Sequence, residues 1–198
     1  DEFQFLKATS DAVRRMSEGE LLQIQKSREI NIDEETYFKI ISDKTASLIS
    51  TCCGIGAISA TDDREKQLVM KEYGELVGIA FQIRDDIFDY TGKSSTIGKP
   101  IGNDLKEKKI TLPLLYSFSK VDKSKVKELV KIIKRDKLQN KNINEIVDFV
   151  KSNGRIEYSE KIAMEYAENA IKKLEIFDDS IAKNSLINFA KFVIERNK

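Results

Sequence analysis

The sequence has 198 residues, enough for one domain with a sizeable core or for two smaller domains. Charged residues make up 34% of the chain but nearly cancel, to a net charge of +1, so nothing in the composition indicates a nucleic-acid-binding surface. The chain contains no histidine, which excludes histidine acid–base catalysis and histidine metal ligands within it.

Helices are predicted throughout, because helix-forming residues predominate and the 9 glycines and 2 prolines are few for this length. The first helix is predicted over residues 3–30, either unbroken or interrupted near Gly19. The next begins at the polar residues 31–35, loosens at the glycines of 54–56 and ends near residue 60.

A third helix, capped by residues 61–63, is predicted to end near residue 90, where the only long predicted loop begins. This loop covers residues 91–110, and so long a loop in a helical chain is usually functional or disordered. The later helices are predicted to start at 111–113 and to span 123–135, 143–152, 155–174 and 180–195. One all-α domain is the simplest architecture, since no repeat or linker divides the chain.

The only cysteines, Cys52 and Cys53, are neighbours in an apolar run. Neighbouring cysteines do not form an ordinary structural disulfide, so both are predicted to be reduced core residues, as in a cytoplasmic protein. No apolar run approaches the roughly 20 residues that cross a membrane, so no membrane span is expected.

Four polar side chains share one side of the third predicted helix. With Asp85 taken as zero, Asp89 falls at about 40°, Gln82 at about 60° and Asp86 at about 100° on a helical projection. The rest of the circumference is apolar, which places the helix in a core, where clustered carboxylates resist ionisation without a cation. Oxygen ligands of this kind suit Mg²⁺. The alternative is a solvated acidic end of the helix.

Lys44 is notable because it lies within an apolar stripe of its own helix. The apolar residues within about 60° of it are Tyr37, Ile40, Ile41 and Leu48. A lysine in such a stripe costs free energy unless it meets an anion, and Thr45 beside it would add a hydroxyl donor. The alternative is a lysine that snorkels from the edge of the core.

The predicted loop 91–110 places lysines directly after the acidic helix. Lys99, Lys108 and Lys109 supply mobile positive charges for phosphate, and the nearby glycines let the backbone approach a ligand closely. Acids that bind Mg²⁺ beside lysines that bind phosphate form the layout of a diphosphate site. The alternative is a solvated basic loop.

Four segments together resemble the motifs of the all-trans polyprenyl diphosphate synthases. Residues 81–89 resemble the family's second aspartate-rich motif, and residues 98–105, with Lys109 and 111–113, resemble the sequence that follows it. Residues 42–46 resemble the family's Lys-Thr motif, and residues 18–23 resemble its Gly-Glu motif. The resemblance covers essentially the whole chain in the family's order and is nearest to bacterial medium- and long-chain synthases of the octaprenyl type.

The resemblance implies an all-α helical bundle of the isoprenoid synthase type around a central cavity. In that fold Asp85, Asp86 and Asp89 would hold Mg²⁺, which bridges the diphosphate of an allylic substrate.

The resemblance also implies a substrate-binding set that consists of Lys44, Thr45, Gln82, Lys99 and Lys109. The lysines would contact the allylic diphosphate, while Thr45 and Gln82 would line the site and steady the departing diphosphate and the allylic cation. Lys44, Thr45 and Gln82 are therefore expected to be the catalytic residues.

The implied enzyme condenses an allylic diphosphate with isopentenyl diphosphate, and is expected to be a homodimer. Nothing in the chain matches the family's first aspartate-rich motif or its basic residues for isopentenyl diphosphate. Residues 1–198 are therefore expected to be the C-terminal portion of a single prenyl synthase domain, and to make no product alone. The alternatives are a non-catalytic binding subunit of a heteromeric synthase and a class I terpene cyclase.

Overall fold

The computed structural model describes residues 2–91, 101–135, 138–152 and 154–196, and within these ranges it consists of helices and their connections, without a strand. In chain order the elements are α1 (Glu2–Glu29), α2 (Glu34–Ile41), η1 (Ser42–Ala46), α3 (Ser47–Ala60), α4 (Arg64–Thr91), α6 (Asn103–Lys106), α7 (Leu112–Ser119), α8 (Lys123–Ile133), α9 (Asn140–Lys151), α10 (Arg155–Lys173), η2 (Leu174–Ile176) and α11 (Ile181–Glu195). The predicted all-α class is confirmed.

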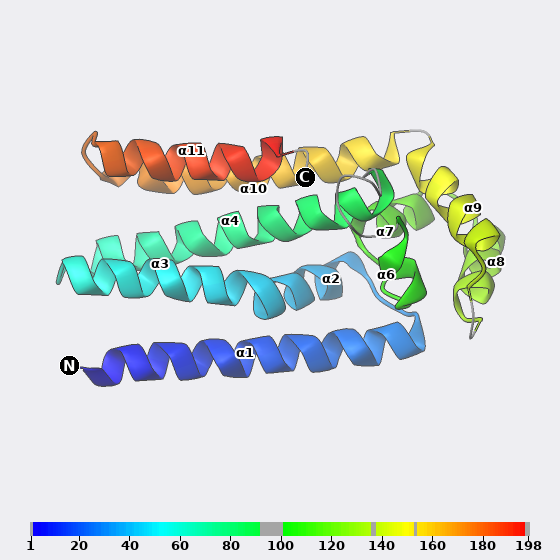
Figure 1. Cartoon of the computed structure of the whole chain (residues 1–198), viewed down its shortest axis with the longest axis horizontal. Helices are drawn as coiled ribbons and strands as arrows, with labels where there is room; N and C mark the ends of the chain where they lie inside the picture. Colours follow the sequence, from blue (N-terminus) through cyan, green and yellow to red (C-terminus); the bar gives the residue numbers. More distant parts are fainter. Residues whose placement is uncertain (1, 92–100, 136–137, 153, 197–198) are drawn as a thin grey trace.

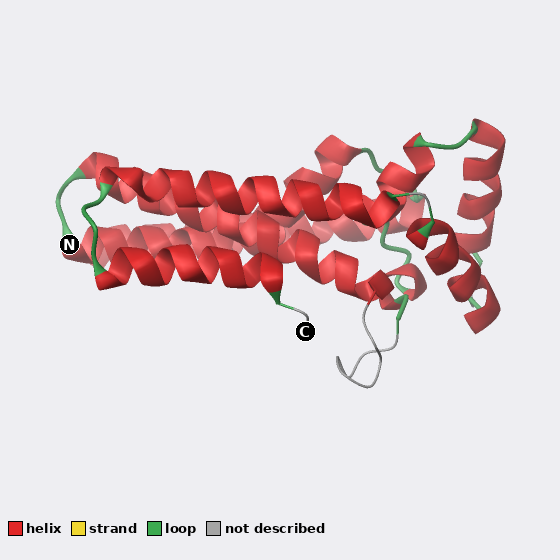
Figure 2. Ribbon diagram, turned by 90° about the horizontal axis from the view of Figure 1, so that it is seen from above, coloured by secondary structure: helices red, strands yellow, loops and turns green. Residues whose placement is uncertain are grey.

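The long helices lie side by side and alternate in direction along the molecule (Figure 1). α1, the continuous rod of α2, η1 and α3, and then α4, α10 and α11 form this main body, and the shorter helices α6 to α9 gather at one end (Figures 1 and 2). α4 lies in the middle of the body and packs most extensively against α3 and α10. No helix in the described ranges is long and apolar enough to cross a membrane.

The second half of α4 lies in the larger apolar core, together with residues of α2, α7, α8, α9 and α10. Ile83, Ile87 and Tyr90 are fully buried there. Burial of side chains of this size contributes roughly 1.5–3 kcal/mol each, so it fixes the rotation of α4 about its axis. The same rotation directs Gln82 and Asp86 toward η1 and α2.

Of the two alternatives for the first helix, the unbroken one is confirmed, because α1 continues through Gly19 as one helix of 28 residues. The expectation of a break in the second helix is wrong. The glycines of 54–56 do not loosen the second helix, because α3 continues through them to Ala60. Packing of α3 along α4 outweighs the cost of roughly 1 kcal/mol for each helical glycine. The irregular turn lies earlier, at η1, which is a π-helix.

The π-helix changes which side chains share a face. Leu48 was expected to lie beside Lys44 in an apolar stripe, but 46% of it is exposed. The wide turn inserts an extra residue, and one residue turns every later position by about 100°. Cys52 is exposed as well, and only Cys53 is partly buried, because neighbours on a helix point in directions about 100° apart.

The predicted loop 91–110 contains more helix than expected. α4 extends to Thr91, and the short helix α6 follows the segment 92–100, which lies outside the described residues. The predicted start of the next helix at 111–113 is confirmed, because α7 begins at Leu112 with proline in its first turn, where proline is tolerated.

Candidate functional site

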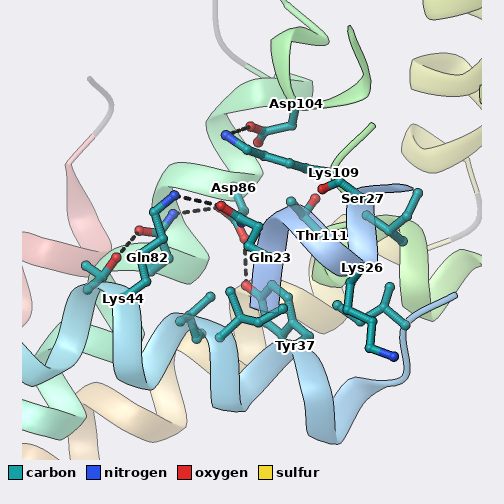
Figure 3. Close-up of a pocket in the computed structure, with 15 residues that line it drawn as sticks. Gln23, Lys26, Ser27, Tyr37, Lys44, Gln82, Asp86, Asp104, Lys109 and Thr111 are labelled. Atoms are coloured by element: carbon teal, nitrogen blue, oxygen red, sulfur yellow. Dashed lines mark hydrogen bonds and ion pairs between the residues drawn. The ribbon is translucent and has the colours of Figure 1, made fainter. Parts of the chain in front are cut away.

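A cavity opens between α1, the rod of α2 and η1, α4, and the segment that contains α6 and the start of α7 (Figure 3). The polar residues that line it include Gln23, Tyr37, Lys44, Thr45, Gln82, Asp86, Asp104 and Lys109. Five residues that the sequence predicted to bind substrate or metal are thus brought together. They are Lys44, Thr45, Gln82, Asp86 and Lys109.

A chain of hydrogen bonds joins η1, α4 and α2 across the cavity wall. The Thr45 hydroxyl donates to Gln82 Oε1 at 2.8 Å, and Gln82 Nε2 donates to Asp86 Oδ1 at 2.8 Å. The other carboxylate oxygen of Asp86 accepts a hydrogen bond of 2.7 Å from the Tyr37 hydroxyl (Figure 3). Burial and the charge of Asp86 raise the pKa of Tyr37 well above its usual range, so its hydroxyl stays a donor.

Two ammonium groups reach the same cavity. Lys44 Nζ donates to Gln23 Oε1 at 2.6 Å and lies 2.5 Å from Glu20 Oε2, and the side chain is 32% exposed. Lys109 Nζ forms an ion pair with Glu107 and lies 3.9 Å from Asp104 Oδ1. Burial opposes the charge of Lys109, but Glu107 and Asp104 raise its pKa, so it stays charged. An anion that enters the cavity would compete with Glu20 for Lys44 and with Glu107 for Lys109.

Asp86 is the buried acid of the site, with 5% of its surface exposed. Burial, followed by the negative charge of Asp104, raises the pKa of Asp86 to about 8, although the hydrogen bonds from Tyr37 and Gln82 oppose this rise. A carboxyl group whose ionisation is penalised in this way gains most when a cation arrives beside it.

Asp89 lies one turn further along α4 and has a local structural role. Its carboxylate accepts the backbone N–H groups of Asn103 at 2.9 Å and Asp104 at 3.1 Å, which cap the start of α6. Burial and the charge of Asp104 raise its pKa to about 6, against the effect of these two hydrogen bonds.

Asp85 faces another part of the molecule. Its carboxylate forms an ion pair with Arg196, just beyond the end of α11, and its side chain is 42% exposed. The guanidinium of Arg196 stacks over the ring of Phe81 at 4.0 Å and also donates to the Phe81 carbonyl at 3.2 Å. Asp85 therefore does not line the cavity that holds Asp86.

The structure thus separates the three predicted metal ligands. Among the described residues, no group of three acidic or sulfur-containing side chains lies close enough together to hold a metal ion. The arc of about 100° that contains Asp85, Asp86 and Asp89 is wide enough for its two edges to face different neighbouring helices. Lys99, the remaining predicted substrate contact, lies outside the described residues.

Comparison with known proteins gives a consistent match along the chain. Residues 1–150 match the polyprenyl synthetase family model. The chain is 30% identical to the octaprenyl diphosphate synthase of Escherichia coli over 98% of its own length and 59% of that protein. It is 29% identical to the short chain isoprenyl diphosphate synthase of Methanothermobacter thermautotrophicus, over 96% of the chain and 58% of that protein.

The fold matches as well. A polyprenyl synthase from Caulobacter crescentus, complexed with calcium and isoprenyl diphosphate, superimposes with a TM-score of 0.93 at 30% identity, over 98% of this chain and 60% of that one. The chain belongs to the polyprenyl synthetase family. The resemblance and the isoprenoid-synthase type of helical bundle are both confirmed, and the chain spans less than two thirds of these relatives' length.

The polar oxygens that line this polyprenyl synthetase cavity are of the chemical types that bind a divalent cation. They are carboxylate, amide and hydroxyl oxygens, which are the hard ligands that Mg²⁺ and Ca²⁺ take. Mg²⁺ is commonly bound by only one or two carboxylates, together with water and substrate phosphates, so a closed set of three acids is not required. Asp86, with its raised pKa, fits such a role, whereas at Asp85 a metal ion would have to replace the Arg196 cation.

Tyr37 and Asp104 are among the cavity residues that were not assigned a role from the sequence. Tyr37 was interpreted only as part of an apolar stripe, yet its position seven residues before Lys44 puts both on one face of the rod. Asp104 was noted within a glycine-containing segment, and it proves to be the charge that perturbs both Asp86 and Asp89. For Tyr37, the available signal was a tyrosine on the buried face of its helix, in a chain whose other core helix carries clustered acids.

Proposed function

We propose that the cavity binds the diphosphate of an allylic substrate together with Mg²⁺, as part of an all-trans polyprenyl diphosphate synthase. The observation that carries this proposal is one cavity in which the ammonium groups of Lys44 and Lys109 accompany the perturbed carboxyl group of Asp86. A diphosphate chelated to a divalent cation offers negative oxygens to the lysines and positive charge to the acid.

Each residue then has a distinct task in prenyl transfer. Lys44 and Lys109 hold the diphosphate and stabilise its charge as it leaves, which is electrostatic stabilisation of the kind that lowers barriers most. The Thr45–Gln82–Asp86 hydrogen bonds keep polar groups aligned toward the forming allylic cation. Mg²⁺ would be held by Asp86 and, once the metal ion displaces Arg196 and the backbone donors of α6, by Asp85 and Asp89, and it would supply further charge neutralisation to the leaving group.

The rest of the cavity suits a reactive carbocation. Ile32, Ile40 and Ile41 form an apolar part of its wall, and such walls exclude water that would otherwise react with the cation. The second substrate is isopentenyl diphosphate, whose double bond attacks the allylic cation. The departing diphosphate would be the base that removes the final proton.

The relatives support the substrate class but leave the product length open. The Caulobacter protein was crystallised with calcium and isoprenyl diphosphate, which is consistent with a divalent cation and an isoprenyl diphosphate here. One matched relative makes short chains and another an octaprenyl product, so similarity alone does not select a length. A homodimer, a cytoplasmic location and the inactivity of residues 1–198 alone stay predictions.

The proposal is tested by isothermal titration of the chain with an allylic diphosphate and with the matching allylic alcohol, each with and without Mg²⁺. We expect the diphosphate to bind in a Mg²⁺-dependent way and the alcohol not to bind. Lys44→Ala should weaken diphosphate binding about tenfold or more, or about 1.4 kcal/mol.

Lys125→Ala is the matched control, because Lys125 is 38% exposed and pairs with Glu128 at 3.0 Å in α8, away from the cavity. It should bind the diphosphate like the wild-type chain. Equal affinities for alcohol and diphosphate, or equal losses in the two lysine variants, would contradict the proposal.

A further inference from the structure

The turn that carries Lys44 and Thr45 is not α-helical. In η1 the backbone N–H of Ser47 donates to the carbonyl of Ser42, five residues back. π-helical turns are rare and occur frequently at functional sites. Since the regular helix is the more common arrangement, contacts outside the turn must favour the wide one.

Arg15 of α1 provides such contacts, together with residues that do not line the cavity. Its Nε donates to Asp43 Oδ1 at 2.8 Å, and its Nη2 donates to the Ser42 hydroxyl oxygen at 2.9 Å. The same guanidinium donates to the Glu75 carboxylate of α4 through Nη2 at 2.8 Å and through Nη1 at 3.2 Å. Lys39 Nζ completes the set by donating to Asp43 Oδ2 at 2.9 Å. We name these five residues the Arg15 network.

The charges of the Arg15 network are balanced, with two cations and two carboxylates. Burial opposes the ionisation of Asp43, but hydrogen bonds from Lys39 and Arg15 lower its pKa. Burial likewise opposes the ionisation of Glu75, and hydrogen bonds from Arg15 and Ser42 lower its pKa. Bidentate contacts of arginine with carboxylate also fix direction, so the network holds α1, η1 and α4 in one geometry.

Two glycines allow α1 and α4 to pack closely against η1 beside the Arg15 network. Gly19 lies one turn after Arg15 on α1, and a Cβ there would be 2.7 Å from the backbone nitrogen of Lys44. Gly78 lies one turn after Glu75 on α4, and a Cβ there would be 2.5 Å from Cα of Ala46. The π turn is therefore enclosed between two backbones, each next to a residue of the Arg15 network.

We propose that Arg15 is a positioning residue that holds the π turn and thereby aims Lys44 and Thr45 into the cavity. Asp43, Lys44 and Thr45 are consecutive, so anchoring Asp43 fixes the directions in which the next two side chains point. Without Arg15, the buried carboxylate of Asp43 and the partly buried carboxylate of Glu75 lose the cation that they share. The inference rests on the proposed function, because it gives Lys44 a diphosphate to contact.

The test compares Arg15→Gln with Arg14→Gln in the 198-residue chain. Arg14 is the matched control, since it is the neighbouring residue, 61% exposed, and pairs only with Asp11 and Glu18 on its own helix among the ion pairs of the described residues. The rate of amide hydrogen exchange in a peptide that covers residues 42–47 measures the stability of the turn. Titration with Mg²⁺ and inorganic diphosphate measures the affinity of the cavity. Glu75→Gln, which removes charge but keeps an acceptor oxygen, replaces Arg15→Gln if that variant does not fold.

We expect Arg15→Gln to speed exchange in residues 42–47 about tenfold and to weaken diphosphate binding about fivefold, with Arg15→Lys in between and Arg14→Gln unchanged. In a Lys44→Ala background, Arg15→Gln should cause no further loss of affinity, because its effect passes through Lys44. A purely structural role would instead speed exchange throughout the chain and weaken binding equally in both backgrounds.

The inference is overturned if exchange in residues 42–47 stays at the wild-type rate, or if the affinity loss is undiminished in the Lys44→Ala background. Failure of the proposed function has a different signature, namely a chain that does not bind diphosphate or binds it independently of Lys44. In that case the exchange measurement still decides whether Arg15 holds the π turn.

Discussion

Two polar clusters share α1, the rod of α2 and η1, and α4, yet they differ in charge balance. In the Arg15 network each carboxylate meets a cation, and the pKa values of Asp43 and Glu75 are lowered although burial opposes ionisation. In the cavity, burial and the charge of Asp104 raise the pKa of Asp86 to about 8 and that of Asp89 to about 6.

The difference separates a structural cluster from a binding site. The Arg15 network is electrostatically complete within the protein, so its members stabilise the fold without any ligand. Among the ion pairs of the described residues, none joins Asp86 or Asp89 to a cation, and groups perturbed in this direction within a cavity are typical of functional sites. Aspartate therefore has a structural role in one cluster and a binding role in the other.

The largest expected effect distinguishes Asp43 from Asp86 by stability. Asp43→Asn should lower the free energy of unfolding at pH 7 by roughly 1–3 kcal/mol, because Arg15 and Lys39 lose their shared charged acceptor. Asp86→Asn should lower it less, because burial and the charge of Asp104 already penalise the negative charge that this substitution removes. Urea unfolding of the ligand-free chain measures both, with the exposed Asp11→Asn as the control.

The two variants should also differ in the pH dependence of stability. The folded-state pKa of Asp86 is raised, so its contribution falls as pH rises from about 4 to about 8, and Asp86→Asn should remove that decline. The folded-state pKa of Asp43 is lowered, so its contribution is present above its unfolded value of about 4 and is lost on further acidification. Equal losses of stability and parallel pH profiles in the two variants would remove the distinction between the clusters.

A smaller effect sharpens the comparison within the cavity. Lys109→Ala should weaken the binding of Mg²⁺ and diphosphate about fivefold. The effect is smaller than for Lys44→Ala because the Glu107 carboxylate competes with the diphosphate for the Lys109 ammonium group. Lys108→Ala is the control, since Lys108 Nζ donates to the Lys134 carbonyl at 3.3 Å rather than lining the cavity. Titration calorimetry separates the two, and a greater loss with Lys108→Ala would argue against the assignment of Lys109.

Much of the fold could be predicted because it depends on local pattern. Apolar spacing placed α4 in the core, and capping residues located the starts of α2 and α4. The π turn at η1 could not be predicted, because it depends on Arg15 and Glu75, which contact it from 27 and 33 residues away. A projection with one fixed period therefore misplaced Leu48 beyond the turn.

The candidate site divides in the same way. Lys44, Thr45, Gln82 and Asp86 could be grouped, since motif spacing on regular helices determines which direction they face. The surroundings of Asp85 and Asp89 could not, because Arg196 and the start of α6 reach them from distant or non-helical parts of the chain. Helical angle alone fixes where a carboxylate points, and the partner that it meets is a tertiary property.

The most direct test of the contrast between the two clusters is a carboxyl ¹³C NMR titration of Asp43 and Asp86, with and without Mg²⁺ and diphosphate. We predict that Asp86 titrates near pH 8 in the ligand-free chain and that its pKa falls markedly when Mg²⁺ and diphosphate bind. Asp43 should titrate below its ordinary range in both conditions. An Asp86 that titrates near pH 4, or one whose pKa does not respond to Mg²⁺ and diphosphate, would contradict the account.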